Sequence, residues 1–428
     1  MTDSKCFFLI GTLTSIRHSR RVNTALLEKN RVEALDLVRG IAVCGLVPIN
    51  SIDFGFGSML LLYPLDLAGA DRTLWMLVMG VGAGKFATLF ASLFGAGMIL
   101  FCGRAEASGR SAASRYLPRL AWLFVIGVLH AYLIWYGDIL VSYAVTGFVL
   151  FWCRNWSAKV FLIIGSALLF TFVFPLVVGA VICHFVDFPL TEEWTELAVT
   201  IRSEGLKETA ALTGSWVEQM KARATYALLI HLLGIPLYLF WFAAMFMCFG
   251  IALMKSGFFT GGWSDRRLGK TTTLLLVIGL PLTLGGYAVF AYAAPTPVLL
   301  IWGYAASFTG MPLVAYGYAG LGVMWSRREN AGILRRSIAA VGRMALTNYI
   351  AQSVLLGLIY YGHGLALRGQ IQFYEAMLIA PAIWVFQMAA SNFWLRHHSH
   401  GPLEWLWRRL TYGRTVSIRK NPSPPPLP

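Results

Sequence analysis

Long apolar stretches, separated by short polar connections, repeat along the whole chain after residue 35. Each stretch is long enough, or nearly so, to cross a hydrocarbon core as a helix, which takes about 20 residues. The pattern predicts an all-α, polytopic membrane bundle of about ten transmembrane helices. The expected spans are 36–58, 74–102, 117–136, 138–153, 158–185, 225–254, 271–293, 298–325, 338–361 and 373–395.

The charges in the connections alternate in sign along the chain. One set of connections carries Arg104, Arg110, Arg115, Arg119, Arg154, Lys159, Lys255, Arg266, Arg267, Lys270, Arg327, Arg328, Arg335 and Arg336. The other set carries Asp66, Asp71, Asp138, the acidic segment 187–218, a neutral Pro-Thr-Pro turn at 295–297, and His363 with Arg368. Basic loops stay in the cytoplasm, so the alternation predicts that both termini are cytoplasmic.

These signals divide the chain into five parts. We expect a cytoplasmic tail at 1–34, a five-helix half at 35–185, an external amphipathic connection at 186–224, a second five-helix half at 225–396, and a cytoplasmic interfacial helix with a disordered Pro-rich tail at 397–428. The external connection is either a surface helix with no part in chemistry or a lid over a site. The sequence has no convincing internal repeat, so the inverted repeat of many transporters is missing.

Composition supports a membrane protein and excludes other classes. The chain is 57% hydrophobic and 13% charged, which is far too apolar for a soluble domain. Its net charge of +15 is spread over short loops, so a nucleic-acid partner is not expected. The six cysteines are scattered without a CxxC pair, and no metal site or cofactor motif appears.

Polar residues enter the first span along one helical face. Asp36, Arg39, Val43, Leu46 and Asn50 follow one another in steps of three and four residues, so they share one helical face. Arg39 and Asn50 are separated by a rise of about 16 Å, roughly half a hydrocarbon core. Polar groups at this depth need buried partners, because unpaired charge in lipid is costly.

Lys85 lies in the middle of the second span, within Gly-Ala-Gly-Lys-Phe. A central lysine costs at least ~2.5 kcal/mol on insertion, so it should face a cavity or a counter-charge. The neighbouring glycines permit a helix break or close packing. The alternative is a lysine that extends to the membrane surface from a span whose ends lie elsewhere.

His130 and Asp138 flank the turn between the third and fourth spans. Eight residues across a tight turn can bring the imidazole and the carboxylate together. A carboxylate on one ring nitrogen fixes the tautomer and leaves the other nitrogen as a base. The alternative is a packed histidine and an Asp138 that faces water.

Arg343 and Asn348 form a second polar stripe at the cytoplasmic start of the ninth span. Arginine geometry suits phosphate, so Arg39 and Arg343 are candidates for holding the phosphates of a cytosolic donor. The alternative is that both arginines anchor their helices at the membrane surface.

Five motifs resemble those of the YeiB family of bacterial inner-membrane proteins. They are LDLVRG at 35–40, KFATLFASLFGAG at 85–97, His130 with GDIL at 137–140, GRMALTNY at 342–349 and GPLEWLWR at 401–408. The resemblance covers nearly all of the chain from residue 31, and the last two motifs look like the domain of unknown function that defines the family. The resemblance implies a multi-pass protein of the bacterial inner membrane.

The Leu-Asp-x-x-Arg-Gly opening is also similar to that of transmembrane acyltransferases, including heparan-alpha-glucosaminide N-acetyltransferase and the acyltransferase-three family. That similarity implies acyl transfer from cytosolic acyl-CoA, as a co-substrate, to an envelope acceptor. In the acyltransferase-three pattern a histidine stands eleven residues after the arginine, where this chain has Asn50. Asparagine is no general base, so His130 would have to take that role.

Two functions from different classes follow. In an acyltransferase, Arg39 and Arg343 would bind the phosphates of the donor. Lys85, Asn50 and Asn348 would line a polar path or stabilise an oxyanion, and His130, oriented by Asp138, would act as base or as acyl carrier. In a secondary transporter of a small solute, Asp36, Arg39, Lys85 and His130 would form a substrate or proton pathway. A scaffold is the weakest reading, because buried charges are costly to keep without use. The oligomeric state, the acceptor and the acyl group are not indicated by the sequence.

Overall fold

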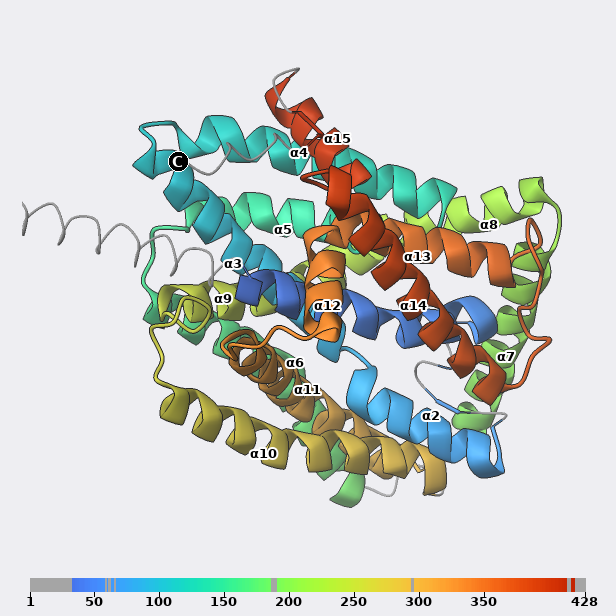
Figure 1. Ribbon diagram of the computed structural model, residues 1–428. Helices are drawn as coiled ribbons and strands as arrows, with labels where there is room; N and C mark the ends of the chain where they lie inside the picture. The colour runs from blue at the N-terminus through green and yellow to red at the C-terminus, as the bar shows by residue number, and fades with distance from the viewer. Residues whose placement is uncertain are drawn as a thin grey trace, which may run out of the picture.

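The protein is a bundle of helices (Figure 1). The computed structural model describes residues 33–57, 60, 63–64, 67–185, 191–293, 296–413 and 417–419. Most of the predicted N-terminal tail and the Pro-rich C-terminal segment lie outside these residues. Within the described part of the chain, extended pairing is limited to an isolated bridge between His398 and Arg419, which confirms the all-α prediction.

Each of the ten expected spans corresponds to one helix or to two or three consecutive helices. They are the N-terminal helix Glu33–Phe56, α2 (Gly69–Gly82) with α3 (Lys85–Ala107), α4 (Ala112–Leu133), α5 (Leu140–Trp152), α6 (Ala158–Phe185), α8 (Trp216–Leu229) with the π-helix η2 (Ile230–Leu239) and α9 (Phe240–Lys255), α10 (Asp265–Tyr292), α11 (Pro297–Ser326), α12 (Ile333–Arg343) with α13 (Ala345–Tyr360), and α14 (Phe373–His397). Eight runs among the described residues are long and apolar enough to cross a membrane, and α5 and α13 are shorter, with 13 and 16 residues. Two further helices, α7 (Thr191–Thr213) and α15 (Pro402–Tyr412), are polar enough to lie outside the hydrocarbon.

Two spans predicted as continuous helices are broken. The span 74–102 breaks between α2 and α3, where Gly84 has the left-handed φ of +75° that favours glycine. The span 338–361 breaks at Met344, which has φ −109° and ψ 36° and joins α12 to α13. Broken helices at membrane depth are tolerated where protein surrounds them. Both breaks adjoin predicted site residues, because Lys85 begins α3 and Arg343 ends α12.

The basic connections gather at one end of the bundle, which we call the basic end. Arg154 forms a salt bridge of 3.1 Å with Glu106, and Nζ of Lys255 donates to the carbonyl oxygen of Trp156 over 2.7 Å. The guanidinium of Arg327 donates to the carbonyl oxygen of Trp263 over 3.1 Å. The contacts link connections far apart in sequence, as the alternating charge pattern requires.

The other connections meet at the opposite end, which we call the acidic end. The amide of Gly362 donates to the carbonyl oxygen of Leu212 over 3.0 Å, so α7 packs on the loop between α13 and α14. The hydroxyls of Thr73, near the start of α2, and Tyr292, at the end of α10, share a hydrogen bond of 2.6 Å. The two sets of loops predicted from charge therefore lie at opposite ends of the bundle.

The N-terminal helix lies in the middle of the bundle (Figure 1, blue) and is 72% buried over its apolar window, against 11% for α6. Its backbone touches that of α12 directly. A Cβ on Gly40 would lie 1.9 Å from the carbonyl oxygen of Ile338, and one on Gly342 would lie 1.8 Å from that of Asp36. Two glycines thus hold the helix carrying Asp36 and Arg39 against the helix carrying Arg343.

Gly342→Ala is predicted to destabilise the protein, because the added methyl overlaps the backbone of the N-terminal helix. Overpacking of this kind costs about 1–3 kcal/mol. We expect a lower midpoint of thermal unfolding in detergent. Gly97→Ala, in α3, is the control: a Cβ there meets no atom within 4 Å, and helical Gly→Ala gains about 0.5–1 kcal/mol. Equal shifts in the two variants would contradict the predicted contact.

Candidate functional site

The turn after α4 builds a buried histidine–carboxylate pair. His130 lies in the last turn of α4, and Asp138 precedes α5. Nδ1 of His130 is 2.8 Å from Oδ2 of Asp138, and the two residues are 1% and 4% exposed. Oδ1 of Asp138 accepts a hydrogen bond of 2.8 Å from the amide of Val141, at the first turn of α5. The expected contact is therefore present, and Asp138 does not face water.

The second ring nitrogen of His130 has no hydrogen-bond partner among the described residues. Its Nε2 is buried, whereas Nδ1 is held by the carboxylate. A proton on Nδ1 that is donated to Asp138 leaves a lone pair on Nε2. The pair has the arrangement of a general base, and its catalytic role remains a prediction.

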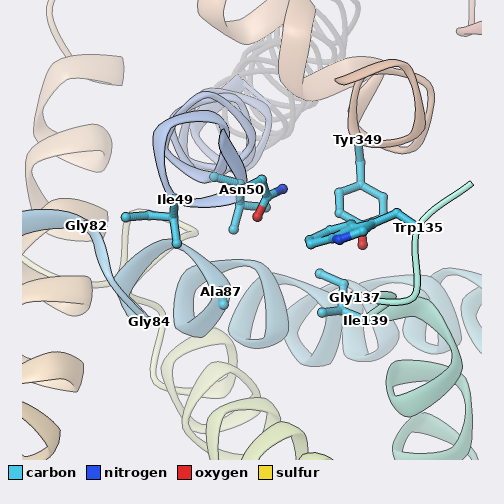
Figure 2. Close-up of a pocket in the computed structure, with 10 residues that line it drawn as sticks. Ile49, Asn50, Gly82, Gly84, Ala87, Trp135, Gly137, Ile139 and Tyr349 are labelled. Carbon is cyan, nitrogen blue, oxygen red and sulfur yellow. The ribbon is translucent and has the colours of Figure 1, made fainter. Parts of the chain in front are cut away.

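A small cavity lies beside the turn that carries Asp138, because Gly137 and Ile139 line it (Figure 2). It has a volume of about 110 Å³. Its lining residues are Leu46, Ile49, Asn50, Gly82, Gly84, Ala87, Trp135, Gly137, Ile139 and Tyr349. Figure 2 shows the amide of Asn50 and the rings of Tyr349 and Trp135 directed toward the same space from three elements.

Asn50 and Tyr349 connect the cavity to the predicted site. Nδ2 of Asn50 is buried and has no hydrogen-bond partner in the described residues. The ring of Tyr349 lies 5.2 Å from that of His130, measured between centroids. His130 does not itself line the cavity. The ring of Tyr349, which does line it, lies beside His130.

Lys85 is fully buried, with 0% exposure, at the break between α2 and α3. Its Nζ donates to the carbonyl oxygen of Met79 over 3.1 Å and lies 5.2 Å from the ring centroid of Tyr287. The lysine thus adds a second hydrogen bond to a carbonyl in the last turn of α2, which also accepts from the amide of Ala83 over 3.0 Å and lies at the negative end of the helix dipole. This position excludes the alternative in which Lys85 extends to the membrane surface.

The predicted donor-binding residues meet at the basic end. Arg39 forms a salt bridge of 2.9 Å with Asp36, and both side chains retain some exposure. Arg343 is exposed and follows Gly342, which contacts the backbone of Asp36. Two arginines with one carboxylate between them leave a net positive charge at this point.

The side-chain amide of Asn348 is held by hydrogen bonds to neighbouring helices. Its Nδ2 donates to the carbonyl oxygen of Val341 over 3.2 Å and to Oγ of Ser391 over 2.9 Å. Its backbone carbonyl accepts from Nε2 of Gln387 over 2.8 Å. The side chain ties α12 to α13 and α14 across the break at Met344, so its amide nitrogen is already engaged.

The predicted polar residues do not all share one chamber. Apolar side chains lie between Arg39 and Asn50 on the N-terminal helix: Val43 and Val47 have 0% exposure. The described cavity is lined by neither Arg39, Lys85 nor His130. The structure therefore places a basic group, a small cavity and a buried base in sequence along the bundle, separated by packed side chains.

Sequence reasoning missed the part that α15 plays at the basic end. Glu404 was assigned to an interfacial helix, but its Oε1 accepts from the amides of Leu346 and Thr347 over 2.7 and 3.1 Å. Burial raises the pKa of Glu404, and the hydrogen bonds from Thr347 and Leu346 oppose that shift. The carboxylate caps the N-terminus of α13, which the Leu-Glu-Trp motif alone did not indicate.

Further cations lie beside Arg343. His400 and Arg408 both belong to the segment that carries α15, and Arg408 and Arg343 both contribute to lowering the pKa of His400, after the larger effect of its burial. Burial lowers the pKa of Arg408, and Arg104 at the end of α3 adds to this. Arg408 is therefore within electrostatic range of Arg104, and His400 is within range of both Arg343 and Arg408. The sequence predicts Arg104 only as a topology signal and presents Arg408 only as part of the GPLEWLWR motif.

The acidic end contains a buried ion-pair network that the sequence did not indicate. Arg368 is 2% exposed, and its Nη1 donates to the carbonyl oxygens of Asp53 and Phe54 over 2.9 and 2.8 Å. Its guanidinium also forms a salt bridge of 2.8 Å with Glu208 of α7. The hydroxyl of Tyr136 donates to the same carboxylate over 2.5 Å. Burial raises the pKa of Glu208, against the lowering effect of Arg368 and Tyr136.

This network joins α7 to the cavity wall. Nε1 of Trp135, which lines the cavity, donates to Oδ2 of Asp53 over 2.9 Å. Tyr136 follows Trp135 directly and binds Glu208. The external connection is therefore anchored to the turn that carries Asp138, as a lid would be.

Glu208→Gln is predicted to destabilise the protein, because it leaves the guanidinium of Arg368 buried without its charge partner. Breaking a buried ion pair on one side costs about 3–5 kcal/mol. Thermal unfolding in detergent measures the change. Glu204→Gln on the same helix is the control, since its bridge to Lys207 is exposed and is worth about 0–1 kcal/mol. A loss no larger than that of the control would mean that the network does not hold α7.

The fold and the buried pair define a polytopic α-helical membrane protein with a histidine–carboxylate site. The family described as "Protein of unknown function (DUF418)" matches residues 253–414. The chain is 31% identical to "Uncharacterized protein YeiB" of Escherichia coli (strain K12), over 88% of this chain and 95% of the relative. It is 30% identical to "Uncharacterized protein YxaH" of Bacillus subtilis (strain 168), over 90% and 95% of the two chains.

The chain therefore belongs to the YeiB family, as its motifs indicated. A third relative, from Bacillus acidopullulyticus, is named as an uncharacterized 39.9 kDa protein in the amylase 3' region and is 26% identical over 91% of this chain. No solved structure gives a significant match.

Proposed function

We propose that this protein is an acyltransferase of the bacterial inner membrane that moves an acyl group from cytosolic acyl-CoA to an acceptor at or across the membrane. The observation that carries the proposal is the buried pair of His130 and Asp138, joined over 2.8 Å, with Nε2 of the histidine unengaged. A carboxylate that orients an imidazole is the usual way to prepare a general base. The basic end faces the cytoplasm, in accordance with the positive-inside rule.

The basic end supplies the donor site. Arg39 and Arg343 bind the phosphates of the donor, and Arg104 and Arg408 add positive charge beside them. Guanidinium groups bind phosphate through two parallel hydrogen bonds, which suits such a site. The thioester then has to reach inward by about 16 Å, the rise of the eleven residues from Arg39 to Asn50.

The transfer step uses the groups around the cavity. A hydroxyl or amine of the acceptor gives its proton to Nε2 of His130 as its oxygen or nitrogen bonds to the acyl carbon. The carbon–sulfur bond of the thioester then breaks, and CoA leaves as the thiolate. Asn50 is the donor available to stabilise the oxyanion, since it lines the cavity and its Nδ2 has no hydrogen-bond partner among the described residues. Lys85 does not line the cavity and donates to Met79, and the amide nitrogen of Asn348 is engaged with Val341 and Ser391.

The path between donor and base has to open for this reaction. Val43 and Val47 fill the helix face between Arg39 and Asn50. The breaks at Gly84 and Met344 adjoin this region and are the places where short helices can tilt without losing many backbone hydrogen bonds.

His130→Ala is predicted to lower acyl transfer by about 10²–10⁴-fold, the usual contribution of a general base. The measurement is transfer of label from labelled acetyl-CoA by purified protein in nanodiscs, with a bacterial envelope extract as the source of acceptor. Asp138→Asn should also lose activity, because the amide no longer favours the required tautomer. His184→Ala is the control, as His184 is exposed at the end of α6. Turnover by His130→Ala equal to that of wild type would rule out this site.

A second candidate is a secondary transporter of a small solute, and the two broken helices favour it. Discontinuous helices place backbone groups at membrane depth in many transporters, and Lys85 and Arg343 stand at such breaks here. Uptake of candidate solutes into proteoliposomes without any acyl donor separates the two functions. Flux that needs no acyl-CoA would favour transport over transfer.

A further inference from the structure

Arg223 is a second fully buried arginine at the acidic end, and its surroundings differ from those of Arg368. Both side chains belong to residues that are at most 2% exposed. Arg368 has the carboxylate of Glu208 and two backbone carbonyls. Arg223 has no salt bridge to a described carboxylate.

The hydrogen bonds of Arg223 are few and weak. Its Nη1 is 3.5 Å from the carbonyl oxygen of Ile134, and its Nη2 is 3.2 Å from the sulfur of Met220. Its Nε has no hydrogen-bond partner in the described residues. A buried guanidinium with so little compensation costs several kcal/mol. Burial and the positive charge of Arg223 both lower the pKa of nearby His363, so that charge is felt by its neighbours.

Trp216 and His363 form an exposed rim over Arg223 at the acidic end. The indole of Trp216 covers the guanidinium, with 4.8 Å from Cζ to the ring centroid, and is itself 53% exposed. His363 is exposed and packs edge-on against Trp216 at 5.3 Å. Nδ1 of His363 donates to the side-chain oxygen of Gln219 over 2.7 Å, so Nε2 of the neutral ring keeps a lone pair and is no donor for an anion.

A neutral donor lies below this rim. The hydroxyl of Tyr361 is buried and has no hydrogen-bond partner among the described residues. It interacts electrostatically with Arg368, Asp53 and Glu208 and, more weakly, with Arg223. The ring of Tyr361 lies 6.0 Å from that of His363. An arginine and a phenol therefore lie beneath the rim that Trp216 and His363 form.

We propose that Arg223 and Tyr361 form a binding subsite, beneath the rim of Trp216 and His363, for an oxyanion, either a carboxylate or a phosphate group, that enters from the acidic end. The guanidinium supplies charge, and the phenol donates a hydrogen bond. The indole of Trp216 moves aside to admit the ligand. The subsite does not depend on the acyl-transfer proposal, because it would serve equally an acceptor, a transported solute or a lipid headgroup.

The test measures thermal unfolding of the full chain in phosphatidylcholine nanodiscs. Sodium phosphate and sodium acetate are compared with sodium chloride at equal ionic strength. We expect phosphate or acetate to raise the unfolding midpoint of wild type in a saturable way, and Arg223→Met to lose this response. In chloride, Arg223→Met should be at least as stable as wild type, since it removes an uncompensated buried charge.

Two further variants make the outcome decisive. Lys221→Met removes an exposed cation from the same helix and should keep the full anion response. Tyr361→Phe removes only the hydroxyl and should weaken the response about tenfold, the value of one hydrogen bond to a charged group. It also decides the matter if Arg223→Met fails to fold.

Two results would overturn the subsite. One is an anion response that Arg223→Met or Tyr361→Phe shares with wild type. The other is no response in wild type, whatever the stability of Arg223→Met. If Arg223→Met were then destabilised, Arg223 would be a structural partner of Ile134. Nanodiscs with phosphatidylglycerol distinguish the source: if the lipid raises the midpoint and removes the effect of added phosphate, the bound oxyanion is a headgroup.

Discussion

The cost of holding charge away from water governs this structure. A charged group inside a membrane protein needs a partner of opposite charge, a set of dipoles or a ligand. Arg368 meets this need with Glu208 and two carbonyl oxygens, and Lys85 meets it with the carbonyl of Met79 and the ring of Tyr287. These contacts also fix the backbone. The ion pair of Arg368 with Glu208 holds α7 on the bundle, and the hydrogen bond of Lys85 to Met79 holds the end of α2.

The helix breaks depend on the same requirement applied to backbone groups. The first amides of a helix lack partners, and inside a membrane protein water cannot supply them. At the break before α13, the carboxylate of Glu404 reaches from α15 to accept from Leu346 and Thr347. The amphipathic helix at the end of the chain is thus part of the bundle's hydrogen bonding as well as its membrane surface. A continuous span would have needed no such carboxylate.

The sequence predicted the features that depend on hydropathy and net charge. Helices at the ten expected positions, the gathering of basic loops at one end and the contact of His130 with Asp138 were expected from local patterns. Eight of the described runs are long and apolar enough to cross a membrane. The break at Gly84 was allowed for by its glycines, whereas the one at Met344 has no comparable local signal. The bridge from Glu208 to Arg368 joins residues 160 positions apart, and no periodicity within either segment indicates it. Long-range pairs of this kind become visible only when the helices are packed together.

The residues of the candidate site lie at separate positions along the bundle and do not line one open passage. Arg39 and Arg343 face the basic end, while His130 lies near the acidic end behind Tyr349. Valines on the N-terminal helix close the interval between them. A closed interval suits both candidate functions, because an acyltransferase must keep water from its thioester and a transporter must never open to both sides at once. What decides between them is whether His130 exchanges a proton with an acceptor or with a pathway. The buried carboxylate on Nδ1 favours the former, since it fixes a single tautomer where a proton relay would need both nitrogens in turn.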